Sequence, residues 1–143
     1  GFEYYLNPSA AVAAFVLNSK GQLLTLRRSK APAKGTLDLP GGFADIGETI
    51  DEALIREVKE ETGLTVTEFE FFTTLPNRYE YSGFIVPTLD TFFVCKVSNE
   101  AELQSNDDAE EALWLDLEEV HTEEFGLRSI RHALSSFLQK YRK

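Results

Sequence analysis

Apolar residues occur along this chain in short runs separated by polar turns. Residues 10–17, AAVAAFVL, form an apolar run with Val and Phe, which predicts a buried strand. Residues 18–21 predict a turn, and QLLTLRR from Gln22 predicts the partner strand of a hairpin. Further strands are predicted for TLDLPGG, where the strand ends at the Pro-Gly-Gly, and for residues 64–75, 88–97 and 112–117.

Two segments show the periodicity of an amphipathic helix. Residues 48–62 carry Leu54 and Val58 four positions apart, and they are followed by Gly63, a residue type that commonly ends helices. In residues 125–143 the apolar positions recur at intervals of three and four. Strands interrupted by one helix and closed by another predict an α/β fold with a mixed sheet covered on both faces. The length of 143 residues fits a single domain, residues 1–143.

The overall charge restricts the classes of partner. The formal net charge is −10, so we expect the surface to repel nucleic acid and anionic membranes. A phosphorylated small molecule remains compatible with this charge when a bound cation reverses the local field. No apolar run approaches the roughly 20 residues of a membrane span. No signal peptide is visible and the single Cys95 has no disulfide partner within the chain, so the sequence predicts a cytoplasmic protein.

The predicted first helix carries glutamates on the side where its apolar residues lie. With Glu57 at zero on a helical wheel, Glu60 falls at about −60° and Glu61 at about +40°, while Leu54 and Val58 fall near +60° and +100°. Carboxylates this close together repel one another and resist burial. A divalent cation would compensate them with hard oxygen ligands. The competing interpretation is a solvated acidic helix with ion pairs four residues apart.

The spacing of these residues extends into a longer motif. Residues 42–64 follow the pattern G-x5-E-x7-R-E-U-x-E-E-x-G-U, in which U is a bulky aliphatic residue. Every specified position is filled, by Gly42, Glu48, Arg56, Glu57, Val58, Glu60, Glu61, Gly63 and Leu64. Its seven fixed positions would match by chance on the order of once in 10⁸ starts or fewer. The motif resembles the box of the Nudix hydrolase superfamily, and looser resemblance covers most of the chain. Leu37 departs from it, because many relatives place Trp there.

The resemblance implies an α/β/α sandwich that hydrolyses a nucleoside diphosphate linked to another moiety, with Mg²⁺ or Mn²⁺ as cofactor. It implies that Glu60, Glu61 and the Gly41 carbonyl are metal ligands. For Glu57 it leaves open the roles of ligand and general base. Arg56 and Glu48 are expected to form a supporting ion pair, for which simple helix-end stabilisation is the alternative.

Relatives often use a further acid from a later loop as base or ligand. Four residues before the predicted strand at 112–117 are candidates for that role, and Glu111 has the spacing that many relatives show; the four are Asp107, Asp108, Glu110 and Glu111. Each has a solvated loop charge as its alternative.

Substrate-binding candidates lie in two places. Arg27 and Arg28 end a predicted strand and should point to opposite faces, so we expect one to contact phosphate and the other to lie on the surface. A predicted loop, LPNRYEYSGFIVPT, carries Arg78 and Tyr79 and would offer aromatic faces to a base, or simply pack over the sheet edge. A similar stretch occurs in NADH-pyrophosphatase-like Nudix proteins, although their fuller motif is missing here.

The sequence at the start of the chain also carries an expectation. GFEYYLNPSAAVAAF resembles the segment after the last Cys of a small zinc ribbon in some Nudix proteins, and the chain contains no Met. We therefore expect a ribbon upstream of Gly1.

Function is expected to be pyrophosphohydrolysis, with ADP-ribose, NADH and nucleoside triphosphates as the leading substrates in that order. A Nudix-fold domain that senses a nucleotide sugar without cleaving it is the alternative, and the complete box argues against it. An isoprenoid diphosphate isomerase on the same fold would need a reactive Cys or an extra Glu, and Cys95 lies in a predicted strand. Members of the family are often dimers, so a homodimer is a further expectation.

Overall fold

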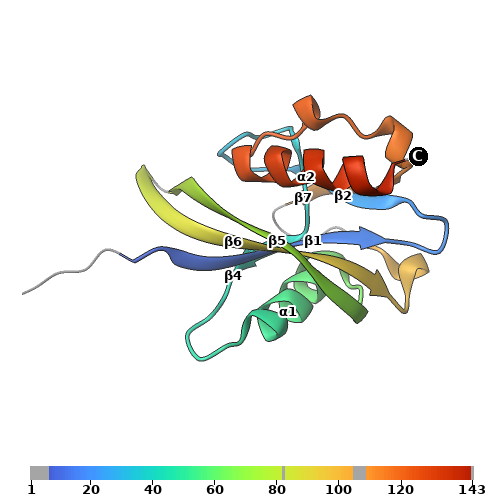
Figure 1. Ribbon diagram of the computed structural model, residues 1–143, viewed down its shortest axis with the longest axis horizontal. Coiled ribbons are helices and arrows are strands. Elements are labelled where there is room, and N and C mark those ends of the chain that lie inside the picture. The colour runs from blue at the N-terminus through green and yellow to red at the C-terminus, as the bar shows by residue number, and fades with distance from the viewer. Residues whose placement is uncertain (1–6, 82, 105–108, 143) are drawn as a thin grey trace, which may run out of the picture.

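A seven-stranded mixed sheet forms the centre of the protein and a helix covers each face (Figure 1). The computed structural model describes residues 7–81, 83–104 and 109–142. The strands are β1 Ser9–Leu17, β2 Leu23–Arg28, β3 Leu37–Asp38, β4 Gly41–Phe43, β5 Val66–Tyr81, β6 Phe84–Val97 and β7 Ala109–Leu115. The helices are α1 Ile50–Thr62 and α2 Arg128–Tyr141, with short 3₁₀ turns at Glu100–Glu102, Leu117–Glu119 and Thr122–Glu124. This arrangement confirms the predicted α/β class.

The sheet is built around a parallel pair of strands. Its main order is β3-β2-β1-β6-β5, with β4 joined to β1 and β7 joined to β2. Strands β1 and β6 run parallel, from the pair Ser9↔Thr88 to the pair Leu17↔Lys96. The predicted hairpin between β1 and β2 is reduced to one register pair, Leu17↔Leu23, because β2 pairs mainly with β7. The prediction of a hairpin partner was therefore right only at the turn.

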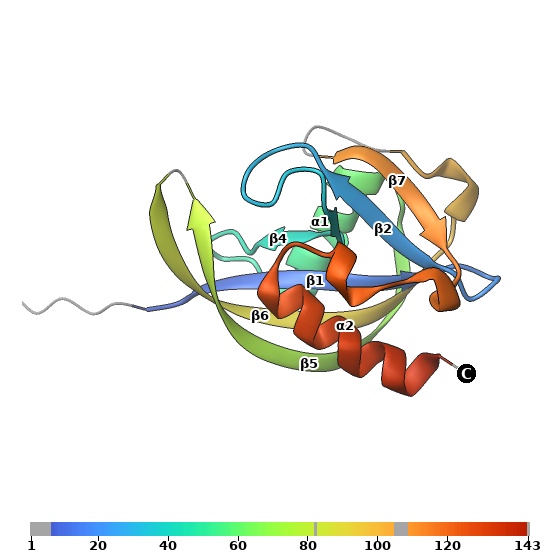
Figure 2. The same ribbon diagram turned by 90° about the horizontal axis from the view of Figure 1, so that it is seen from above.

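Residues 75–88 differ most from the prediction. The predicted loop is a continuation of two strands, and β5 and β6 pair antiparallel along almost their whole length, ending at the pair Tyr81↔Phe84. The far end of this two-stranded ribbon extends beyond the rest of the sheet (Figure 2). The prediction of a loop carrying Arg78 and Tyr79 was wrong, and both residues lie on β5.

Each face of the sheet has its own apolar core. One cluster lies under α2 and contains Phe15, Phe92, Phe125 and Phe137, all fully buried. The other lies under α1 and contains mainly smaller aliphatic side chains, among them Val12, Leu54 and Val58. No helix among the described residues is long and apolar enough to cross a membrane.

Candidate functional site

Helix α1, Ile50–Thr62, ends at the predicted residue and begins two residues after the predicted start at residue 48. The Thr49 hydroxyl accepts a hydrogen bond from the Glu52 amide while the Glu52 carboxylate accepts one from the Thr49 amide, and this reciprocal cap satisfies two N-terminal donors. Gly63 ends the helix in the left-handed conformation, at φ 76°. The buried residues Ala53, Leu54 and Val58 fix the helix on the sheet. The orientation that results sets the direction of the glutamates in its last two turns.

Arg56 links the helix to the loop that precedes it. Its guanidinium donates two hydrogen bonds to Glu48, at 2.7 and 2.9 Å, and one to the Phe43 carbonyl at 3.0 Å. The bonds from Arg56 to the Glu48 carboxylate, together with one that the Asp45 amide donates to it, lower the pKa of Glu48 to about 2. The same guanidinium also reaches Glu57 at 2.8 Å and Glu60 at 3.1 Å. The expected pair of Arg56 and Glu48 is thus present, and it holds the loop against the helix.

Glu57 is enclosed beneath the backbone of β4. Its side chain is 16% exposed, and burial raises its pKa while Arg56 opposes the shift. A Cβ atom added at Gly42 would lie 2.6 Å from the Glu57 carboxylate. A side chain at position 42 would therefore have to displace the end of the Glu57 side chain.

Glu61 contacts the neighbouring glycine. The Gly41 amide donates a hydrogen bond of 2.8 Å to the Glu61 carboxylate. A Cβ atom at Gly41 would lie 2.1 Å from the carbonyl oxygen of Val12, so glycine is also required here for the pairing of β4 with β1. Glu60 differs from the other two glutamates because its side chain is 59% exposed. The expectation that all three glutamates share the apolar stripe is correct for Glu57 and Glu61 and wrong for Glu60.

Glu57, Glu60 and Glu61 form the acidic cluster, and in this structure Arg56 compensates part of its negative charge. Across residues 7–81, 83–104 and 109–142, no three carboxylate, imidazole or thiol groups are gathered into a ready-made cation site. The Arg56 guanidinium occupies the place between Glu57 and Glu60. The donor set nevertheless fits a hard divalent cation, because it consists of carboxylate oxygens beside a glycine cradle with no Cβ to fill it.

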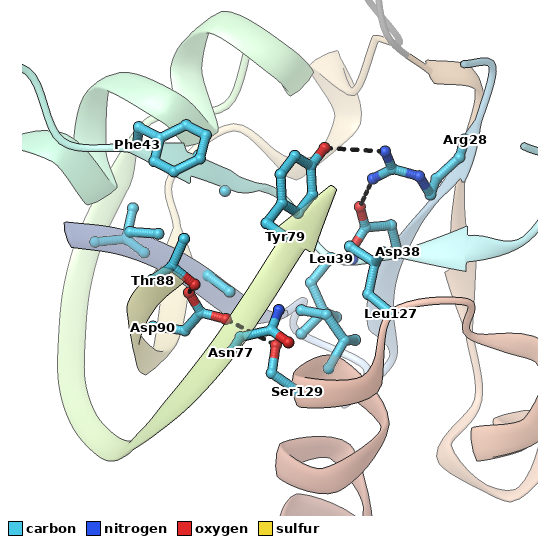
Figure 3. A pocket seen from close by; sticks show the side chains of 16 residues that line it. Arg28, Asp38, Leu39, Phe43, Asn77, Tyr79, Thr88, Asp90, Leu127 and Ser129 are labelled. Carbon is cyan, nitrogen blue, oxygen red and sulfur yellow. Dashed lines mark hydrogen bonds and ion pairs between the residues drawn. The ribbon is translucent and has the colours of Figure 1, made fainter. Parts of the chain in front are cut away.

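A cavity of about 120 Å³ borders the two glycines that contact Glu57 and Glu61, and Figure 3 shows the side chains that line it. Gly41, Gly42 and Phe43 form part of its wall, so the two glycines contact the glutamates on one side and the cavity on the other. The remaining walls come from β1, β2, β3, β5, β6 and the start of α2. The rings of Phe43 and Tyr79, two of the lining residues, meet edge to face with centroids 5.9 Å apart.

The cavity is lined by polar groups that already bond to one another. Arg28 donates to Asp38 at 2.6 Å and to the Tyr79 hydroxyl at 3.3 Å. Burial raises the pKa of Asp38, against the effect of Arg28, and the charge of Asp90 raises it further. Asp90 accepts hydrogen bonds from Thr88 at 2.8 Å and from Ser129 at 2.7 Å, which ties β6 to the start of α2.

A wider groove of about 900 Å³ shares part of this lining. It runs along the β5–β6 ribbon and the start of α2, and Asn77, Tyr79 and Thr88 belong to both depressions. Its own walls carry three basic residues, Arg78, Arg128 and His132.

The four expected substrate-binding residues lie in different parts of the structure. Arg27 donates to Glu111 on β7 at 2.8 Å and to the Gly35 carbonyl at 2.9 Å. Arg28 and Tyr79 lie in the cavity wall, and Arg78 lies in the groove. Both Arg27 and Arg28 are thus engaged by carboxylates, and the expectation that one of them contacts phosphate stays a prediction.

Of the four acidic residues considered after residue 104, only Glu111 has a described side chain. Asp107, Asp108 and the Glu110 side chain lie outside the described residues. Glu111 is half-exposed and paired with Arg27.

Sequence reasoning missed the acids of the cavity. Asp38 and Asp90 each interrupt an apolar run, in TLDLPGG and in TLDTFFV, and such an isolated charge within a predicted strand was the available signal. Ser129 carried no comparable signal, because it reaches Asp90 only through the packing of α2.

Similarity to known proteins agrees with this arrangement. The sequence matches the NUDIX domain over residues 7–135. An ADP-ribose pyrophosphatase of Methanocaldococcus jannaschii is 36% identical over 118 residues, which are 81% of this chain and 66% of that protein. A human mitochondrial NAD(P)H pyrophosphatase, NUDT13, is 31% identical over 123 residues, which are 83% of this chain and 32% of that protein. The chain therefore spans just under two thirds of the first relative and about a third of the second.

Solved structures share the fold. A MutT NUDIX hydrolase from Burkholderia pseudomallei superposes with a TM-score of 0.77 at 22% identity, covering 90% of this chain and 97% of that one. The NUDIX domain of Shewanella oneidensis NrtR, crystallised with ADP ribose, superposes with a TM-score of 0.76 at 18% identity, covering 95% and 90%. With the complete 42–64 motif and the match over residues 7–135, these findings show that the chain belongs to the NUDIX domain family.

Proposed function

We propose that this protein hydrolyses the phosphoanhydride bond of a nucleoside diphosphate linked to another moiety. The observation that carries the proposal is the position of Glu57 and Glu61 against Gly42 and Gly41, at the wall of a cavity. The glutamate oxygens that lie against these glycines can hold a cation next to a phosphate, while the cavity and groove receive the rest of the molecule. ADP-ribose is the first candidate substrate, followed by NADH and nucleoside triphosphates, and the relatives named as ADP-ribose and NAD(P)H pyrophosphatases support that order.

A divalent cation, Mg²⁺ or Mn²⁺, belongs to this proposal. Glu57, Glu60, Glu61 and the Gly41 carbonyl would hold it, with Arg56 keeping its two bonds to Glu48 and releasing the other glutamates. Such a cation neutralises phosphate charge and acidifies bound water. Three carboxylates within two turns of one helix remain strongly anionic beside a single guanidinium, which is the electrostatic reason to expect cation binding.

The remaining roles fall to residues around the cluster. Arg56 and Glu48 position the end of β4, the strand that carries the two glycines, and the loop that follows it. Glu57 is either a ligand or the proton acceptor, and Glu111 is a second candidate for accepting the proton. We assign substrate contacts to Arg27, Arg28, Arg78 and Tyr79. A cytoplasmic location and a homodimer complete the proposal.

A panel assay tests the function directly. ADP-ribose, NADH and nucleoside triphosphates are incubated with the protein and a phosphatase that releases phosphate from the products, with and without Mg²⁺. We expect turnover only with the metal. We expect Glu60→Gln and Glu61→Gln to lower kcat by about 10³-fold, because each removes an anionic ligand of the cation that would stabilise the transition state. Glu68→Gln, an exposed acid on β5, is the matched control. Full activity of both glutamine variants would remove these residues from the metal site.

A sensor without hydrolytic activity is the second candidate. The observation that favours it is the similarity to the NrtR NUDIX domain, whose structure holds ADP ribose. Saturable binding of ADP-ribose with no product after prolonged incubation with Mg²⁺ would select this alternative. The isomerase alternative loses support, because Cys95 is buried in β6 and burial raises the pKa of its thiol to about 12.

A further inference from the structure

Arg78 and Arg128 differ from the other arginines of the protein. The side chains of Arg78 on β5 and Arg128 at the start of α2 form no hydrogen bond or ion pair with any other described residue. The other five arginines each donate to a carboxylate or a backbone carbonyl, and they are Arg27, Arg28, Arg56, Arg131 and Arg142. Carboxylates are plentiful in a chain whose net charge is −10. Two guanidinium groups without such a partner are therefore available to a ligand.

Both of these arginines line the same depression, the wider groove of about 900 Å³. His132 lines it as well, and it lies four positions after Arg128 on the same side of α2. Glu80 is the one acid among the described residues of the wall, so the two arginines give the wall a net positive charge. The protein as a whole has the opposite sign. An anion would therefore find complementary charge in this groove.

The groove is separate from the acidic cluster and continuous with the cavity. Its described lining includes neither Gly41 nor Gly42, nor any glutamate of the acidic cluster. It shares five lining residues with the cavity, all labelled in Figure 3, and they are Asn77, Tyr79, Thr88, Leu127 and Ser129. The cavity in turn borders the two glycines. A substrate whose phosphoanhydride lies at the acidic cluster can thus extend into the groove, and an anion held there is a different group from the phosphoanhydride.

The side chains of the groove favour a phosphate monoester as that anion. A monoester carries about −1.5 to −2 charges at neutral pH and three strong acceptor oxygens. Guanidinium groups donate paired hydrogen bonds to such oxygens, and an imidazole offers a further donor. The volume of about 900 Å³ also lies within the roughly 300–1,000 Å³ of small-molecule sites. The groove therefore suits a phosphate group that is attached to a larger molecule.

We propose that the groove binds a second phosphate of the substrate, a monoester on a ribose of the nucleoside diphosphate derivative, and that Arg78 and Arg128 select for it. The inference rests on the proposed function for the phosphoanhydride part of the substrate. It adds a preference for dinucleotides that are phosphorylated on a ribose hydroxyl over the same dinucleotides without this phosphate. The two arginines determine this specificity because they contact the added phosphate.

The alternative is that these arginines are solvated surface charges. Both are exposed, and exposed charged residues commonly maintain solubility. Loss of such a charge would weaken all anionic ligands slightly, through long-range electrostatics that salt screens. Loss of a binding residue would instead change the preference between two ligands that differ by one phosphate. The test therefore measures that preference.

Calorimetry with ligands that lack a phosphoanhydride separates binding from hydrolysis. Adenosine 2′,5′-bisphosphate and AMP differ only by the 2′-phosphate. We expect the wild-type protein to bind the bisphosphate about tenfold or more tightly, as hydrogen bonds between charged groups predict. Arg78→Gln and Arg128→Gln should each reduce this ratio to within about threefold. Neither side chain bonds to another described residue, so both variants should keep the wild-type Tm.

Hydrolysis of NADPH and NADH with Mg²⁺ gives the second measurement, since NADPH carries the additional 2′-phosphate. We expect kcat/KM to favour NADPH by about tenfold and this ratio to fall in the same two variants. Lys140→Gln is the matched control, because it removes the same charge from an exposed residue of α2 that does not line the groove. It should leave both ratios unchanged. Inorganic phosphate added to the NADH reaction distinguishes a free anion from a phosphate carried by the substrate.

Equal or unmeasurable affinities of the wild type for the two nucleotides would overturn the inference. An unchanged ratio in both arginine variants, or an equal fall of the ratio in Lys140→Gln, would do the same. An effect of inorganic phosphate on NADH hydrolysis without a preference for NADPH would assign the groove to a free anion instead. Preference in binding without hydrolysis of either dinucleotide would remove only the proposed function, and hydrolysis of both with equal kcat/KM would remove only the inference.

Discussion

The two faces of the sheet bury their helices by different means. Under α2 the contacts are aromatic, and the rings of Phe15 and Phe137 stack with centroids 4.3 Å apart and 4° between their planes. Under α1 the core is built from small aliphatic side chains, and the last two turns of the helix carry Glu57 and Glu61 at the edge of that core. Close packing of aromatic rings holds α2 on its face of the sheet. On the other face, aliphatic packing holds α1, and charged side chains lie at the edge of the contact.

This difference indicates which face of the sheet can hold ionised side chains that take part in a reaction. A face filled by stacked rings has no room for an ionised group without a partner. A face with a narrow aliphatic stripe leaves the flank of its helix for carboxylates. The cavity wall includes β4, which lies beside α1, and the start of α2, so segments next to both helices contribute to it.

Truncation of the aromatic core should have the largest effect. Phe137→Ala removes a fully buried ring that contacts Phe15, Phe72 and Tyr141, and we expect a loss of about 3–5 kcal/mol in the free energy of unfolding. Ile55→Ala on α1 is the comparison, since that side chain is 39% exposed and should cost under about 1 kcal/mol. Urea denaturation measures both variants, and similar losses would show that the buried Phe137 ring contributes no more to stability than an exposed side chain.

Substitutions at Gly41 and Gly42 should affect stability and activity to different degrees. In Gly42→Ala the new methyl group meets the end of the Glu57 side chain, which can move, so we expect roughly a 10²-fold loss in kcat/KM with a small change in Tm. In Gly41→Ala it meets the backbone of β1, so we expect loss of stability first. The assay and thermal unfolding are run on both variants. Full activity in Gly42→Ala would mean that the position of Glu57 does not matter for turnover.

The smallest effect concerns the ion pair between Arg56 and Glu48. The pKa of Glu48 falls from an ordinary value of about 4.3 to about 2 in the folded protein. A lowered folded-state pKa stabilises the protein above the unfolded-state value, and this contribution is lost as the pH falls from about 4.3 toward 2. We expect Glu48→Gln to have a lower Tm than the wild type at pH 6 and the gap to narrow at pH 3. A gap that is constant between the two pH values would contradict this assignment.

The sequence predicts those residues of the site that lie on one helix, α1. Glu57, Glu60, Glu61 and Arg56 are neighbours on α1 because helical geometry brings residues three and four apart together, and Gly63 ends the helix as expected. The cavity was not predictable in this way. Asp38, Tyr79, Asp90 and Ser129 come from four elements whose contact depends on the sheet order.

The ribbon was wrongly predicted as a loop because of its prolines. Pro76 and Pro87 are typical of loops, since proline cannot donate to a strand ladder. Pro76 is tolerated because β5 lies at the end of the strand order. Pro87 is tolerated because the pairing of β6 with β1 starts one residue later, at Thr88. Sequence alone does not show which strand will lie at an edge.

The parallel pairing of β1 with β6 also affects how the chain folds. Ser9 pairs with Thr88 and Leu17 with Lys96, so the middle of the sheet joins segments separated by most of the polypeptide. Closing so large a loop costs entropy before any contact rewards it, and topologies of this kind fold slowly, in milliseconds to seconds. The β5–β6 hairpin is the nearest local pairing, and we expect it to assemble early and to act as the template on which the first strand of the chain docks.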